Sequence, residues 1–302
     1  MGDTIVKPNF FLIGAPKAGT TSVCELLGAH PDVFICDPKE PQFFTVPKKF
    51  KRGYAWYAAL FESAAGHKAV GDGSTTYSQT GVYPDALKRL VDYSPDARII
   101  YITRSPLARL ESMWIQLRHR GVSIPASFRK ALRTWPELID SGLYWTQINA
   151  YRRYFPDERI LVLFFEDFTA DPHAVLSRCF KFLEVAPESD IPDADRPRNV
   201  WSDKHEDRIA LNALRQLPGY DRLRDALIPK ALRRAFKRTF TKPIRQRPQW
   251  DEQTRRWVVD RIADDVRRFL EFYGKPADFW PLDAPGCPTE LDSETVASRK
   301  TC

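Results

Sequence analysis

The chain has 302 residues, of which 43% are hydrophobic and 28% are charged. This length excludes a single small module and suits one large globular domain or two small ones, which need no disulfide staple to stay folded. The net charge of +7 fits either a solvated basic surface or a surface that attracts anions, such as nucleic acid, a multiply phosphorylated nucleotide or an anionic sugar.

The cysteines predict neither a disulfide framework nor a zinc site. There are five, they are scattered, and none has C-x-x-C spacing. The apolar run at residues 10–15 is far shorter than the ~20 residues of a membrane helix, and no signal peptide is recognised. We therefore expect a cytoplasmic protein without a membrane span.

Predicted strands and helices alternate through the first part of the chain. Residues 9–14 form an apolar run that ends in glycine, which predicts a buried parallel strand, and the apolar spacing over 20–29 predicts a helix. Further strands are predicted at 33–36, 68–72, 98–103 and 160–165, and further helices at 86–91, 107–118, 143–154 and 174–183. This order predicts an α/β fold, a P-loop-like parallel sheet with helices on both faces.

The character of the sequence changes at about residue 196. Strand patterns disappear, basic residues, proline and tryptophan become frequent, and residues 252–273 have the spacing of one amphipathic helix. We expect a single domain over residues 1–282, with a core at 9–185 and a helical basic cap or acceptor region at 196–280. The polar residues 283–302 are predicted to be a disordered tail.

The first motif, residues 14–22, lies between a predicted strand and a predicted helix. It reads Gly-Ala-Pro-Lys-Ala-Gly-Thr-Thr-Ser. Backbone N–H groups at such a helix start bind anions, although a glycine-proline turn with a threonine cap has the same residues. The G-x-x-x-x-G spacing matches half of an ATP-binding P-loop, but Thr20 and not lysine follows Gly19. The strand at 98–103 is also followed by arginine instead of a magnesium-binding aspartate.

The second motif pairs Arg104 with Ser112, eight residues later. Eight residues are just over two helical turns, so both side chains can lie on one side of the helix. An arginine fork and a hydroxyl suit a terminal phosphate. Taken alone, an arginine at a strand end is more often paired with a surface carboxylate.

Together these segments resemble the sulfotransferase family, above all the heparan sulfate N- and 3-O-sulfotransferases and their bacterial relatives. The resemblance covers residues 9–185 well and extends more weakly to about 280. Further matching segments are His30-Pro31, Lys39-Glu40-Pro-Gln-Phe43-Phe44 and residues 154–167.

The resemblance implies a donor, 3'-phosphoadenosine 5'-phosphosulfate (PAPS), and a product, 3'-phosphoadenosine 5'-phosphate (PAP). Because a sulfuryl group carries less charge than a phosphoryl dianion, we expect that no metal is required. The resemblance places Arg104 and Ser112 at the 3'-phosphate, and Glu40 as the base that takes the acceptor's proton. Lys17 would neutralise the leaving phosphate. The residues implied to bind the 5'-phosphosulfate are Lys17, Ala18, Gly19, Thr20, Thr21 and Ser22.

The chain departs from the heparan enzymes at Gly73, which stands where those enzymes carry a lysine near the transferred group. Either Lys17 alone suffices or another group replaces that lysine. The neighbouring residues Ser74, Thr75 and Tyr77 are expected to line the acceptor side. Arg198 is expected near the 3'-phosphate, although a solvated basic linker explains it equally well.

Three alternatives compete with an active sulfotransferase. A P-loop nucleotide kinase would need ATP, magnesium and a lysine directly after Gly19. A nucleic-acid-binding protein would use the basic stretch 233–247, although no known binding module surrounds it. A degenerate sulfotransferase would only bind nucleotide. We expect an acceptor that is carbohydrate-like or a small molecule, with a hydroxyl or an amine, and no nucleic-acid partner.

Overall fold

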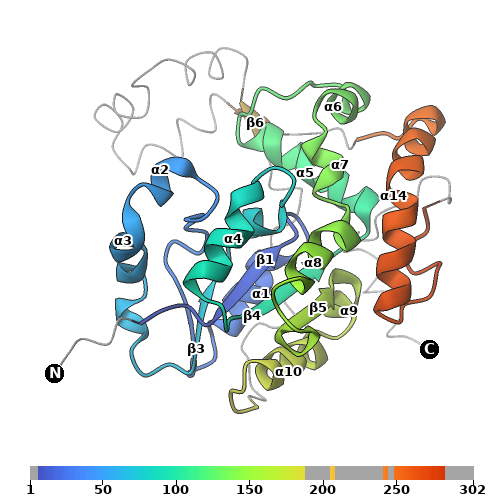
Figure 1. Ribbon diagram of the computed structural model, residues 1–302. Coiled ribbons are helices and arrows are strands. Elements are labelled where there is room, and N and C mark those ends of the chain that lie inside the picture. Colours follow the sequence, from blue (N-terminus) through green and yellow to red (C-terminus); the bar gives the residue numbers. More distant parts are fainter. Residues whose placement is uncertain (1–5, 188–204, 208–240, 244–247, 283–302) are drawn as a thin grey trace, which may run out of the picture.

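A five-stranded parallel sheet forms the centre of the computed structural model, which describes residues 6–187, 205–207, 241–243 and 248–282 (Figure 1). Its strands are β1 (Phe10–Gly14), β2 (Val33–Ile35), β3 (Ala69–Asp72), β4 (Arg98–Thr103) and β5 (Ile160–Phe164). They lie in the order β2-β3-β1-β4-β5. All residues of β1 are buried, as expected for a central strand that is covered on both faces.

Helices cover both faces of this sheet. The helices of the described residues are α1 (Thr20–Leu27), α2 (Pro47–Phe50), α3 (Gly53–Ala59), α4 (Pro84–Tyr93), α5 (Pro106–His119), α6 (Phe128–Thr134), α7 (Glu137–Asp140), α8 (Tyr144–Arg152), α9 (Phe165–Ala170), α10 (Pro172–Phe182) and α14 (Glu252–Phe272). From β1 to β2 the chain moves toward one edge of the sheet, and from β2 through β3 and β4 to β5 it moves toward the opposite edge. Right-handed connections therefore place α1 on one face and α3, α4 and α8 on the other. α1 packs against α10, and α8 packs against α14. The predicted α/β fold is confirmed.

The long C-terminal helix α14, at the right of Figure 1, is joined to α8 by a buried carboxylate. Asp265 accepts hydrogen bonds from the backbone N–H groups of Trp145 (2.9 Å) and Thr146 (2.8 Å), in the first turn of α8. A negative charge at that helix end is favourable, although burial raises the pKa of Asp265. No helix among the described residues is long and apolar enough to span a bilayer.

The prediction that strands are absent after residue 196 is wrong. Strands β6 (His205–Asp207) and β7 (Thr241–Pro243) form an antiparallel pair. Strands this short show no alternating pattern, and their pairing depends on a partner far along the chain, so local sequence does not reveal them. The expected tail at 283–302 lies outside the described residues.

Candidate functional site

The loop at residues 15–19 connects β1 to α1 and leaves the start of that helix open. Gly19 precedes α1 with φ 94°, and no side chain caps the helix. A Cβ at Gly19 would lie 2.7 Å from Cδ2 of Phe165, so only glycine fits there without displacing that ring. The first N–H groups of α1 have no partner within the helix, so they can bind an anion.

Lys17 joins this loop to α5. Its Nζ donates a hydrogen bond to Oε1 of Gln116 over 3.2 Å. Gln116 lies four residues after Ser112 in α5, so both are on the same helix face. The structure therefore brings Lys17 to the face of α5 that carries Ser112. Sequence reasoning missed Gln116, although its spacing from Ser112 was a usable signal.

Arg104 follows β4 and packs on the ring that also touches Gly19. Its guanidinium lies 4.6 Å from the centre of the Phe165 ring. Burial lowers the pKa of Arg104, and the nearby Glu166 carboxylate opposes that shift. The Tyr144 hydroxyl donates to the Arg104 carbonyl over 2.7 Å and holds its backbone. Arg104 and the loop at residues 15–19, called the phosphate loop below, therefore both lie against Phe165, a residue that the sequence did not point to.

Glu40 is held by three polar neighbours. The Thr75 hydroxyl lies 3.4 Å from each oxygen of the Glu40 carboxylate. Lys39 Nζ lies 3.2 Å from Oε1, and Nε2 of Gln42 lies 3.4 Å from Oε2. The Glu40 side chain remains 27% exposed, so its carboxylate can still reach a ligand.

The segment η2 (Thr75–Ser78), which binds Glu40, packs directly on the start of the phosphate loop. A Cβ at Gly14 would lie 2.3 Å from Oγ of Ser78 and 3.2 Å from the carbonyl oxygen of Thr75. Strands β3, β1 and β4 are adjacent and parallel, so their carboxyl ends share one edge of the sheet. This confirms that the segments after these three strands lie together, where ligands of such sheets bind.

A buried carboxylate at the end of β3 organises the Glu40 side of the site. Oδ1 of Asp72 accepts from the backbone N–H of Ser74 over 2.9 Å. Oδ2 accepts from the hydroxyls of Tyr57 (2.7 Å) and Tyr77 (2.8 Å). Burial raises the pKa of Asp72 to about 6, because the hydrogen bonds only partly offset the loss of solvation.

The hydroxyls of Ser74 and Tyr77 hold the segment after Glu40 in place. Ser74 Oγ accepts from the backbone N–H of Gln42 over 2.9 Å, and the Tyr77 hydroxyl accepts from that of Phe43 over 3.1 Å. Both side chains are buried. Their hydroxyls therefore bind within the protein, as the Thr75 hydroxyl does at Glu40, and a role for these residues on the acceptor side stays a prediction.

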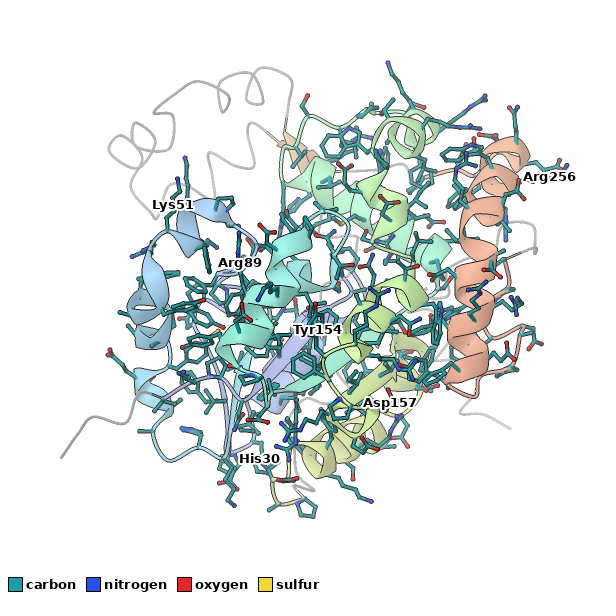
Figure 2. All side chains as sticks on the ribbon, in the orientation of Figure 1. His30, Lys51, Arg89, Tyr154, Asp157 and Arg256 are labelled. Atoms are coloured by element: carbon teal, nitrogen blue, oxygen red, sulfur yellow. The ribbon has the colours of Figure 1, made fainter. Side chains whose placement is uncertain are left out.

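Arg89 anchors the same segment from α4. In Figure 2 it lies on the side of α4 that faces α2 and α3. Its Nη1 donates to the Phe44 carbonyl over 3.0 Å, and its guanidinium stacks 4.3 Å from the centre of the Phe50 ring. The chain after Glu40 is therefore fixed from the sheet and from a helix.

The remaining expected ligand residues are placed as follows. Ala18 and Thr20 are buried, and Thr21 and Ser22 are half-buried in the first turn of α1. Arg198 lies outside the described residues. Among the residues that the structure describes, no cluster of three or more His, Cys, Asp or Glu side chains could hold a metal ion. Transfer without a metal stays a prediction.

The chain is similar to known sulfotransferases. The family model for the sulfotransferase domain matches residues 7–218. Human heparan sulfate glucosamine 3-O-sulfotransferase 6 is 27% identical over 235 residues, which cover 74% of this chain and 62% of that protein. The mouse bifunctional heparan sulfate N-deacetylase/N-sulfotransferase 3 is 28% identical over 219 residues, 64% of this chain and 24% of its own length. The chain thus spans less than two thirds of either relative.

Among solved structures, a sulfotransferase from Alicyclobacillus acidocaldarius superposes with a TM-score of 0.65 at 25% identity, covering 91% of this chain and 99% of that one. Its similarity extends over nearly the whole length of both chains, so the two share one fold. The match to the family model covers more than half of the chain and contains the phosphate loop, Glu40 and Arg104. The chain therefore belongs to the sulfotransferase domain family.

Proposed function

We propose that this protein is an active sulfotransferase that uses PAPS as donor and transfers its sulfuryl group to a hydroxyl or amine of a carbohydrate acceptor. The proposal rests on one observation: a candidate donor-binding loop and a candidate base lie at the same edge of the sheet. An open helix start with Lys17 beside it suits the phosphosulfate, and Glu40 is fixed next to that loop through Thr75.

The proposed reaction is an in-line displacement at sulfur. A new bond forms between the acceptor oxygen or nitrogen and sulfur, while the bond between sulfur and the bridging oxygen of the 5'-phosphate breaks. The electron pair of the broken bond stays on the phosphate, where Lys17 and the N–H groups of α1 stabilise the charge. Glu40 takes the proton that the acceptor loses. Arg104 and Ser112 bind the 3'-phosphate and so set the position of the donor.

The choice of a carbohydrate acceptor rests on the relatives, whose names specify heparan sulfate. The net charge of +7 also favours an anionic sugar chain over a neutral small molecule. Whether oxygen or nitrogen accepts the group is decided by the assay below.

Donor binding is the first test, by calorimetric titration of PAP without magnesium. Wild type should bind in the micromolar range, and Arg104→Ala should bind about 10- to 100-fold more weakly, because a charge-assisted contact to phosphate is lost. Arg52→Ala is the matched control, since Arg52 also stacks on an aromatic ring, Trp56, at 4.0 Å. A preference for ATP with magnesium would favour the kinase, and salt-sensitive DNA binding without PAP binding would favour the nucleic-acid reading.

Transfer is the second test, with radiolabelled PAPS and de-sulfated heparan chains that carry either free amines or only hydroxyls. Glu40→Gln should lower the rate about 100- to 10,000-fold and leave PAP affinity unchanged. Glu62→Gln, an exposed carboxylate on η1 (Glu62–Ala64), is the control. Equal rates for Glu40→Gln and wild type would remove Glu40 from the mechanism, and PAP binding without any transfer would leave a nucleotide-binding protein.

A further inference from the structure

The lysine next to Glu40 lies over the glycine at the end of β3. A Cβ at Gly73 would lie 3.3 Å from Cε and 3.4 Å from Cγ of Lys39, and 2.7 Å from Sγ of Cys24. The backbone N–H of Gly73 also donates to the Lys39 carbonyl over 3.2 Å. The absence of a side chain at residue 73 therefore provides the space in which the Lys39 stem lies.

The charged end of Lys39 is paired with Glu40. Its Nζ lies 3.2 Å from Oε1 of Glu40, and the two side chains are 22% and 27% exposed. Cys24, which contacts this position, is one turn into the helix that follows the phosphate loop. Burial raises the pKa of the Cys24 thiol to about 12, and the Lys39 ammonium opposes this shift. The ion pair therefore lies beside α1, the helix that follows the phosphate loop.

A base in this position faces an electrostatic difficulty. The carboxylate of Glu40 has to work next to a donor that is itself negatively charged, and like charges at short range repel each other. Lys17, the other lysine of the site, is directed toward α5 through Gln116. The ammonium that is bonded to Glu40 belongs to Lys39.

We propose that Lys39 is the second cation of the transfer site. Its side chain occupies the space that Gly73 leaves open, and its charge offsets the repulsion between the Glu40 carboxylate and the sulfuryl group of the donor. Lys39 acts through Glu40 and is a positioning residue. The proposal rests on the function proposed above. It assigns to Lys39 the charge that this chain lacks at residue 73.

The test compares the affinities for PAPS and PAP, which differ by the sulfuryl group alone, so no acceptor is needed. Lys39→Met keeps the apolar stem over Gly73 and removes the charge. It should weaken PAPS about tenfold and PAP less than about twofold, because one charge-assisted interaction is lost at the sulfuryl end only. Lys39→Arg should bind both ligands as wild type does. Lys88→Met, which breaks the exposed pair of Lys88 with Asp92, should change neither affinity.

A double variant separates charge balance from folding. If Lys39 acts by offsetting Glu40, Lys39→Met combined with Glu40→Gln should recover most of the lost preference for PAPS. Lys39→Gln provides the same comparison should Lys39→Met lower the melting temperature. Equal losses for PAP and PAPS, or no loss for either, would overturn the role of Lys39. Failure of wild type to bind PAP would refute the proposed function itself, so the two failures are distinguishable.

Discussion

The two sides of the site differ in how far they depend on backbone conformation and on side-chain contacts. The phosphate side is built around backbone, namely a short loop, a helix start and a glycine at which a Cβ would collide with Phe165, and the side chains of Lys17 and Arg104 lie beside it. The Glu40 side consists of side chains, and its hydrogen bonds converge on the buried carboxylate of Asp72. A backbone site depends on conformation at one or two positions, whereas a side-chain site depends on contacts between distant segments. The predictions that follow test this contrast.

The largest effect is expected on the phosphate side. Gly19→Ala places a methyl group 2.7 Å from the Phe165 ring at a residue with φ +94°, where side chains are strained. Because the same ring supports Arg104, PAP affinity should fall at least about 1,000-fold in calorimetry. Gly81→Ala is the control, since nothing lies within 4 Å of its new Cβ. Unchanged binding in Gly19→Ala would mean that the loop does not require this conformation.

On the Glu40 side, the buried carboxylate makes stability depend on pH. Burial raises the pKa of Asp72 from 3.8 to about 6, so between these values the folded protein keeps a proton that the unfolded chain has released. Its contribution to stability is therefore largest at low pH and falls as pH rises through this window, by at most about 3 kcal/mol.

Asp72→Asn removes this titration. The free energy of unfolding is measured by urea denaturation for both proteins. The value for wild type, relative to that for Asp72→Asn, should fall from about pH 4 to about pH 7. Asp92→Asn, in an exposed ion pair, is the control. A difference that is the same at every pH would contradict the raised pKa.

Removal of one hydroxyl from this network should have a smaller effect. Tyr77→Phe takes a donor from Asp72 and leaves the buried N–H of Phe43 without its acceptor. Stability should fall by about 1 to 2 kcal/mol in urea, and transfer should slow about tenfold with PAP affinity unchanged. Tyr154→Phe is the control, because Tyr154 is 52% exposed (Figure 2). A loss of PAP affinity as large as the loss in rate would show that the two sides are not independent.

The smallest effect is expected at Thr75. Its contacts with the Glu40 carboxylate are long, 3.4 Å to each oxygen, so Thr75→Val should slow transfer only about two- to fivefold. Thr134→Val removes a comparable hydroxyl contact, to the Lys130 carbonyl on α6, and should leave the rate unchanged. A hundredfold loss in Thr75→Val would instead assign the hydroxyl a direct contact with the acceptor.

The same contrast explains what could be predicted from the sequence. The parallel sheet and the turn from β1 to α1 are encoded locally, in apolar runs and a glycine motif, and both agree with the structure. Phe165 and Asp72 were missed as organising residues, because their contacts join segments far apart in the chain. Ser74 and Tyr77 were identified as polar residues near the site, but their buried hydrogen bonds to the segment after Glu40 were not. Which hydroxyls become buried depends on the packing of neighbouring segments, which local patterns do not contain.

The Phe165 ring has a consequence for the choice of nucleotide. One edge of the ring lies against Gly19 and Arg104 lies over the ring, so the same side chain supports two proposed anion-binding points. A site with two separate anion-binding points selects ligands by the separation of their charges as well as by the number of charges. ATP, with all its phosphates in one chain, would reach only one of the two points, whereas a nucleotide phosphorylated at both ends of its ribose would reach both.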